Sequence, residues 1–229
     1  MRKQRPDFRV WEGKKAALFD LDGTLMDSMW IWDRIDIEYL ASFGKTISRA
    51  ELLRLQKKIE GMSMAETAEV FRDAYGIPDP PELMQKSWNE MAYEKYARDV
   101  RLKEGARDLL FQMQQQGLKL GVVTSNTELL TRAALEGNGM LQDFDLIRSA
   151  QSVPRGKPAP DVYLAAASDL GVSPGDCIVF EDVPNGAGSG KNAGMEVCGV
   201  EDQFAKDRRE ELYRLVDFYI RSFVEILRP

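Results

Sequence analysis

The sequence contains no histidine among its 229 residues. This absence excludes mechanisms that depend on imidazole, namely Ser-His-Asp and Cys-His hydrolysis, HExxH zinc sites, and histidine general bases or phosphocarriers. Cysteine is scarce, since Cys177 and Cys198 are the only two and lack metal or redox spacing. Both lie in apolar, strand-like runs, so we expect buried free thiols in a reducing cytosol and hence a cytoplasmic protein.

Long apolar runs are also absent, and none approaches the roughly 18 residues of a membrane span. Residues 1–15 are basic and lack the apolar core of a signal peptide, so we expect a solvated tail, with a contact arm for an anionic partner as the alternative. The net charge of −6 comes without a basic stripe, which argues against binding to duplex nucleic acid. The sequence therefore predicts no membrane association, no nucleic-acid partner and no obligate protein partner.

The periodicity of the chain changes at two points. An apolar strand is expected at residues 15–19, and helical patterns then fill residues 28–100, with Ser48 and Glu51 forming a capping box. From about residue 104 the pattern alternates between strands and helices, which predicts a parallel sheet covered on both faces. We therefore expect an α/β core made of residues 1–27 and 101–229, with residues 28–100 inserted as an all-helical domain. Strands are expected at 119–123, 146–148, 177–180 and 195–200, and helices at 106–116, 128–136, 161–170 and 186–192.

The C-terminal segment fits two patterns. Apolar residues between 212 and 223 follow a helical period, whereas Phe218 to Ile220 also fit a short edge strand, with Ser222 capping a final turn. We favour the strand.

Two carboxylates follow the first expected strand. Asp20 and Asp22 lie at its carboxyl end, where open parallel sheets bind ligands, and side chains at i and i+2 of an extended chain point the same way. Gly23 permits a tight turn next to them. Such a pair suits a Mg²⁺ site or a nucleophile beside a general acid, and its alternative is a solvated Asp-rich turn.

Polar side chains also follow the later strands. Because parallel strands end at one edge of a sheet, carboxylates, a hydroxyl and a lysine should converge there. Hard oxygen ligands suit Mg²⁺, and a lysine beside the ion suits a phosphoryl group in transfer. Taken singly, the lysine fits a solvated side chain and the threonine fits a helix cap. The residues are Thr124, Ser125 and Asn126 after the second strand, Lys157 in the loop before a helix, and the pair Glu181 and Asp182.

The ordered set of motifs resembles the haloacid dehalogenase superfamily, from about residue 15 to residue 227. The subgroup it resembles holds β-phosphoglucomutases and phosphatases. The resemblance implies a Rossmann-like parallel sheet core, and the helical insert is similar to the family's C1 cap. The motifs are Asp20-Leu21-Asp22-Gly23-Thr24, Thr124-Ser125-Asn126, Gly156-Lys157-Pro158 and Glu181-Asp182.

The resemblance implies a role for each carboxylate. Asp20 would be the nucleophile that forms an aspartyl-phosphate, and Asp22 would protonate the leaving oxygen and then deprotonate the attacking water. Mg²⁺ would be held by the Asp20 carboxylate, the Asp22 backbone carbonyl and Asp182, with Glu181 assisting directly or through water. Covalent catalysis divides the displacement into two steps, and the metal neutralises charge.

The resemblance also implies how the phosphoryl group is bound. Thr124 and Lys157 would contact its oxygens, and Ser125 and Asn126 would support them. The substrate expected from this set is a small phosphorylated metabolite.

Two positions in the helical insert depart from the mutase pattern. That branch carries a cap histidine where this chain has Trp32, and a cap-loop arginine where this chain has Met64 after Gly61-Met62-Ser63. Both departures favour a phosphatase, because an arginine there would hold the second phosphate of a bisphosphate.

Three residues of the insert are candidates for substrate binding. We expect the loop at Gly61 to close over the substrate and Trp32 to line the pocket, with a place in the cap core as the alternative for Trp32. Lys86 is a candidate replacement for the missing arginine, or else part of a solvated helix face. The overall prediction is a Mg²⁺-dependent phosphatase of small phosphomonoesters, with a phosphomutase or a non-catalytic binding protein as alternatives. A dehalogenase fits less well, because that branch needs no metal and generally lacks an aspartate at the position of Asp22.

Overall fold

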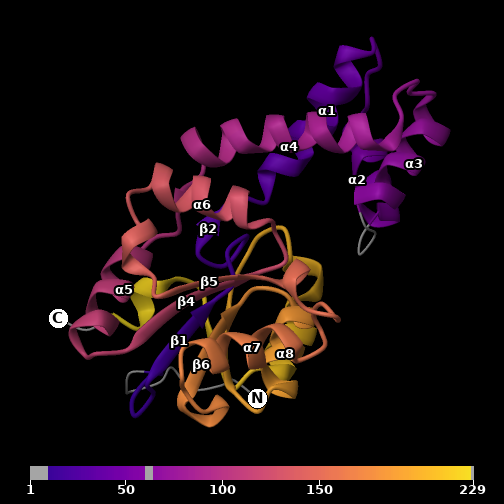
Figure 1. The fold of residues 1–229 in the computed structure, drawn as a ribbon. Helices are drawn as coiled ribbons and strands as arrows, with labels where there is room; N and C mark the ends of the chain where they lie inside the picture. The colour runs from indigo at the N-terminus through magenta and orange to yellow at the C-terminus, as the bar shows by residue number, and fades with distance from the viewer. Residues whose placement is uncertain (1–9, 60–63, 228–229) are drawn as a thin grey trace. The chain divides into compact units, whose positions relative to one another are not determined.

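The computed structural model describes residues 10–59 and 64–227. The chain divides into two compact units, a core unit formed by Met1–Ser28 with Val100–Pro229 and a helical unit formed by Met29–Asp99. Among the described residues, no helix is both long and apolar enough to span a membrane. Figure 1 shows the helices and strands of each unit.

A six-stranded parallel sheet forms the centre of the core unit. Its strand order is β5-β4-β1-β6-β7-β8, so the first strand of the chain lies in the middle of the sheet (Figure 1). The predicted α/β fold with a parallel sheet is thereby confirmed. The strands are β1 (Ala16–Phe19), β4 (Lys119–Thr124), β5 (Leu146–Ser149), β6 (Cys177–Glu181), β7 (Glu196–Val200) and β8 (Phe218–Ile220).

The register of the sheet aligns β1 with both of its neighbours near the carboxyl edge. Phe19 pairs with Val122 on one side and with Phe180 on the other. The Asp20 N–H continues this ladder by donating to the Phe180 carbonyl at 3.0 Å. The residues that follow Phe19 and Phe180 therefore emerge side by side at the carboxyl edge.

The two faces of the sheet have different cores. On one face the Phe19 and Phe180 rings stack with centroids 4.6 Å apart, and Phe223 meets both edge-on. Because successive strand residues point to opposite faces, Leu18 and Val179 lie in the other core, beneath α7 and α8. Helices of the core unit are α5 (Ala106–Gln115), α6 (Glu128–Gly137), α7 (Asp161–Asp169), α8 (Pro184–Asn192) and α9 (Arg209–Leu215). Short 3₁₀ turns are Leu141–Asp143, Ala150–Ser152, Pro174–Asp176, Lys206–Arg208 and Phe223–Glu225.

The C-terminal segment contains the edge strand that the sequence favoured. β8 pairs with β7 in parallel, and the Ser222 hydroxyl accepts from the Val224 N–H as the cap of the last turn. The helix α9 was not predicted, because its seven residues are mostly charged and only Leu212 is buried.

A small antiparallel ladder was also missed. β2 (Met26–Asp27) pairs with β3 (Arg101–Leu102), so the chain segments on either side of the helical insert lie together. Two residues per strand leave no periodicity to read in the sequence.

The helical unit consists of α1 (Trp30–Ser42), α2 (Arg49–Ile59), α3 (Met64–Tyr75) and α4 (Pro81–Arg98). The predicted capping box is present, because Ser48 Oγ accepts from the Glu51 N–H while the Glu51 carboxylate accepts from the Ser48 N–H. Tyr39, Phe71 and Trp88 pack edge-to-face in its core, with centroids 5.0 to 6.4 Å apart.

Candidate active site

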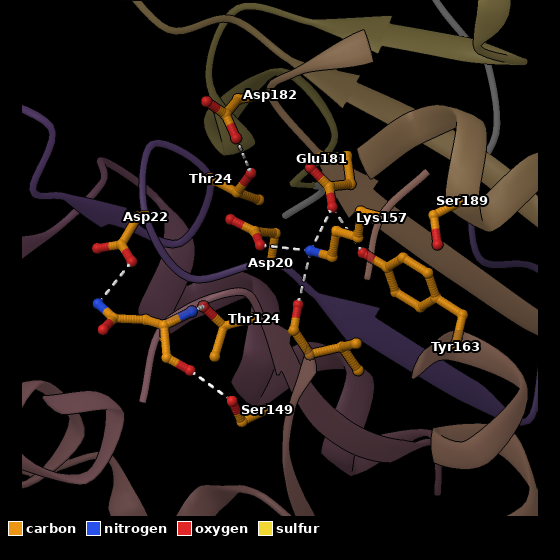
Figure 2. Close-up of polar contacts among 12 residues, drawn as sticks. Asp20, Asp22, Thr24, Thr124, Ser149, Lys157, Tyr163, Glu181, Asp182 and Ser189 are labelled. Atoms are coloured by element: carbon orange, nitrogen blue, oxygen red, sulfur yellow. Dashed lines mark hydrogen bonds and ion pairs between the residues drawn. The ribbon is translucent and has the colours of Figure 1, made fainter. Parts of the chain in front are cut away.

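The carboxyl edge of the sheet collects the charged side chains that the sequence singled out. Asp20 follows β1, Glu181 ends β6, and Lys157 reaches them from the loop before α7 (Figure 2). Asp20, Lys157 and Glu181 are all buried. Because an isolated charge in the protein interior costs free energy, these buried side chains need partners of opposite charge.

Lys157 joins two carboxylates. Its Nζ donates to Asp20 Oδ1 and to Glu181 Oε1, each at 2.6 Å, and to the Val123 carbonyl at 3.0 Å. Burial alone would lower the pKa of Lys157, but the two adjacent carboxylates raise it above its usual range. The lysine is therefore a permanent cation, fitted to hold anionic oxygens rather than to exchange protons.

The two oxygens of Glu181 have different surroundings. Oε1 accepts from Lys157 and also from the Tyr163 hydroxyl at 2.8 Å, whereas the buried Oε2 has no hydrogen-bond partner among the described residues. Gly186 borders the same carboxylate so closely that a Cβ there would lie 2.0 Å from it. These contacts fix the orientation of the Glu181 carboxylate, and Oε2 is the oxygen that has no hydrogen-bond partner among the described residues.

Three carboxylates form a cluster that fits a hard cation. Asp20, Glu181 and Asp182 each offer an oxygen within 4.8 Å of the others. Burial, with Glu181 adding to it, raises the pKa of Asp182 to about 8, and burial also raises the pKa of Asp20, although Lys157 opposes that shift. Buried like charges and an unpartnered Oε2 are the features that a divalent cation with oxygen preference would satisfy. The donor set therefore fits Mg²⁺.

Asp22 is held differently from the cluster. Its Oδ1 accepts from the Ser28 hydroxyl at 2.6 Å and its Oδ2 from the Asn126 side-chain amide at 3.0 Å. Asp20 accepts from the Lys157 ammonium group, whereas the Ser28 and Asn126 donors to Asp22 are neutral, and different environments let two carboxylates take different roles.

The segment after β4 forms a polar turn beside Asp22. Thr124 Oγ1 accepts from the Asn126 N–H at 3.0 Å, and the Ser149 hydroxyl donates to the Asn126 carbonyl at 2.6 Å (Figure 2). The bond to Asn126 uses a lone pair of Thr124, so the hydroxyl hydrogen can still be donated to a ligand. Thr127, not Thr124, caps the following helix.

This arrangement matches a known family. The sequence profile of the haloacid dehalogenase-like hydrolases matches residues 17–200. The chain belongs to this family. Three of the four motifs lie at the carboxyl ends of β1, β4 and β6, and Gly156-Lys157-Pro158 lies in the loop before α7.

Relatives of this haloacid dehalogenase-like chain include phosphatases. Validoxylamine A 7'-phosphate phosphatase of Streptomyces hygroscopicus subsp. limoneus is 33% identical over 94% of this chain and 97% of its own. Hexitol phosphatase B of Escherichia coli is 29% identical over 92% and 93%. The crystal structure of CbbY from Rhodobacter sphaeroides in complex with phosphate aligns with a TM-score of 0.79 and 26% identity, covering 93% of this chain and 96% of that one. Family and relatives together make this chain a phosphoric monoester hydrolase of the haloacid dehalogenase type.

The predicted residues of the helical unit are not tested by the structure. Trp32 lies on α1, and Lys86 lies on the exposed face of α4 with its Nζ 3.9 Å from the Glu90 carboxylate. Gly61 lies outside the described residues. Their roles in substrate binding stay predictions, as does the exposed Ser125.

Four site residues received no role from the sequence. Thr24 donates to Asp182 at 2.8 Å, Ser28 donates to Asp22, Tyr163 donates to Glu181, and Gly186 leaves room for that carboxylate. Thr24 stood inside the first motif, which was a usable signal. Tyr163 and Gly186 resembled ordinary helix residues, and only the packing of α7 and α8 shows their contacts.

Proposed function

We propose that this chain hydrolyses small phosphomonoesters with a divalent cation, Mg²⁺, through an aspartyl-phosphate on Asp20. The observation that carries the proposal is the buried cluster of Asp20, Glu181 and Asp182, with Lys157 set between two of its members. The Asp22 backbone carbonyl would add a further oxygen ligand. When bound, the cation would neutralise charge on the carboxylates and on the phosphoryl oxygens.

The nucleophilic step belongs to Asp20. A carboxylate oxygen of Asp20 attacks phosphorus as the bond from phosphorus to the leaving oxygen breaks, and Lys157 holds Oδ1 so that the carboxylate cannot rotate away. Lys157 and the Thr124 hydroxyl stabilise the phosphoryl oxygens as charge shifts onto them, with Ser125 and Asn126 supporting the turn.

Asp22 acts first as the general acid and then as the general base. As an acid it gives its proton to the leaving oxygen, and the resulting carboxylate then takes a proton from the water that attacks the phosphoaspartate. The second step releases phosphate and restores Asp20. Ser28 and Asn126 keep the Asp22 carboxylate aimed during both steps.

The substrate class that we propose is a sugar phosphate or a similar polyol phosphate. Supporting this are the relatives named for validoxylamine 7'-phosphate and for hexitol phosphates. We also propose that residues 28–100 act as a cap that selects among substrates, with Gly61, Trp32 and Lys86 as its contact residues. A cytoplasmic location stays a prediction of the sequence.

The test is a panel of phosphorylated metabolites with phosphate detection, run with Mg²⁺ and with a chelator. Asp20→Asn should abolish Mg²⁺-dependent phosphate release, because an amide is a poor nucleophile. The exposed Asp207→Asn serves as the matched control and should keep full activity. Unchanged turnover in Asp20→Asn would remove Asp20 from the mechanism.

The same panel separates the two alternatives. A phosphomutase would convert a sugar phosphate into an isomer with no net phosphate release, which chromatography of the products detects. A non-catalytic binding protein would turn over none of the panel, although one member would raise the melting temperature. Trp32 and Met64, in place of the mutase histidine and arginine, favour the phosphatase.

A further inference from the structure

Tyr163 is a buried residue that contacts the acidic cluster from α7. It is 0% exposed, and its hydroxyl donates to Glu181 Oε1 at 2.8 Å. Figure 2 shows its ring lying beside Lys157 with the hydroxyl directed at Glu181. The proposed catalytic steps make no use of this side chain.

Tyr163 shares its acceptor with Lys157. The lysine Nζ donates to the same Oε1 at 2.6 Å and lies 5.2 Å from the centroid of the Tyr163 ring. Tyr163 therefore stabilises the ion pair of Lys157 and Glu181 in two ways. Its hydroxyl donates a hydrogen bond to the carboxylate, and its ring face lies toward the ammonium group.

The consequence is an asymmetric carboxylate. With two donors on Oε1 and Gly186 behind the group, the buried Oε2 is the oxygen of Glu181 that lacks a hydrogen-bond partner among the described residues. A carboxylate oxygen that is buried without a hydrogen-bond partner carries a large desolvation cost. A cation bound to that oxygen would offset the cost.

We propose that Tyr163 is a positioning residue that turns Glu181 so that Oε2, and not Oε1, faces the divalent cation. The inference rests on the proposed function, because it assumes a cation at the cluster. Tyr163 touches neither the substrate nor the phosphoryl group in this scheme, and it acts by fixing a metal ligand and the lysine beside it. Outer partners of metal ligands commonly contribute in this way.

The variant that isolates this role is Tyr163→Phe. It keeps the ring against Lys157 and removes only the hydroxyl, so the Glu181 carboxylate gains rotational freedom. We expect the dissociation constant for Mg²⁺, measured by isothermal titration calorimetry of the full chain, to rise about tenfold. Activity should fall most at limiting Mg²⁺ and recover toward wild type as Mg²⁺ is raised.

Tyr39→Phe is the matched control. Its hydroxyl donates to Asp79 Oδ2 at 3.0 Å, so this variant also removes a tyrosine–carboxylate hydrogen bond, in the helical unit. Both variants should lower the melting temperature of the metal-free protein, but only Tyr163→Phe should weaken Mg²⁺ binding. A purely structural role for Tyr163 would lower the melting temperature and leave the Mg²⁺ affinity equal to that of Tyr39→Phe.

The outcomes separate this inference from the function beneath it. If wild type binds Mg²⁺ and hydrolyses a phosphomonoester while Tyr163→Phe has the same or a tighter Mg²⁺ dissociation constant, the role of Tyr163 is wrong and the proposed function stands. If wild type neither binds Mg²⁺ nor needs it for turnover, both proposals are overturned.

Discussion

Gly186 offers a sharp steric test of the acidic cluster. It lies in α8, and a Cβ added there would meet the Glu181 carboxylate carbon and Oε1 at 2.0 Å and Oε2 at 2.1 Å. No special backbone conformation is required at this position, so Gly186→Ala perturbs the site only through the added methyl group. The carboxylate must retreat by more than about 1 Å before it reaches ordinary van der Waals contact.

The structure allows the size of the effect to be worked out. The bonds from Lys157 and Tyr163 to Oε1 measure 2.6 and 2.8 Å, so a movement of that size stretches at least one of them past a useful length. Weakening a donor to a buried charge costs about 1–3 kcal/mol, whereas alanine in place of a helical glycine contributes about 0.5–1 kcal/mol in the other direction. We therefore expect a net loss of up to about 2.5 kcal/mol in unfolding free energy, together with Mg²⁺ affinity weakened by about tenfold or more.

Gly188→Ala is the matched control in the same helix. Its Cβ would meet only Pro158 Cβ at 3.7 Å, which is ordinary contact, so the helix gain should appear alone. Urea unfolding gives the stabilities, titration calorimetry gives the Mg²⁺ affinity, and phosphate release gives the activity. Equal Mg²⁺ affinity and activity in the two variants would refute the reasoning, because it would mean that the position of Glu181 does not matter.

Two further predictions concern pH. Burial, with Glu181 adding to it, raises the pKa of Asp182 to about 8, above its value of about 4 in the unfolded chain. Ionisation of Asp182 by itself should therefore lower the stability of the metal-free protein as pH rises from 4 to 8, by up to about 1.4 kcal/mol per pH unit. Saturating Mg²⁺ should flatten this slope in urea unfolding, and identical slopes with and without the ion would contradict the metal site. Burial, with help from Asp33, raises the pKa of Asp36 on α1 to about 7. The stabilisation of Asp36→Asn relative to wild type should therefore grow between pH 4 and pH 7 and then level off, and a pH-independent difference would count against a buried ionising group.

Much of the fold was predictable because its signals are local. The capping box at Ser48 and the apolar runs of the sheet are set by residues within a few positions of each other, and both are present. The edge strand β8 followed from the same kind of reading. The β2–β3 ladder pairs Asp27 with Arg101, and such distant partners leave no trace in a local pattern.

The candidate site divides in the same way. That Asp20, Lys157 and Glu181 would share one sheet edge followed from the parallel order of strands, whose carboxyl ends coincide. Which oxygen accepts from which donor did not follow, because rotamers are chosen by packing. The contact of the Tyr163 hydroxyl with Glu181 could not be predicted from the sequence, because it depends on how α7 packs against the sheet.

The sequence by itself determined which chemical groups the candidate site contains. Its four ordered motifs, in a chain without histidine, place carboxylates, a lysine and a hydroxyl near the carboxyl edge of a parallel sheet. The tertiary structure alone decided how these groups are joined: Lys157 lies between Asp20 and Glu181, Ser28 and Asn126 donate to Asp22, and one oxygen of Glu181 has no hydrogen-bond partner among the described residues. The physical reason is burial, because the pairing of a buried charge depends on every neighbour that packing brings within hydrogen-bond distance, however far away it lies in the chain.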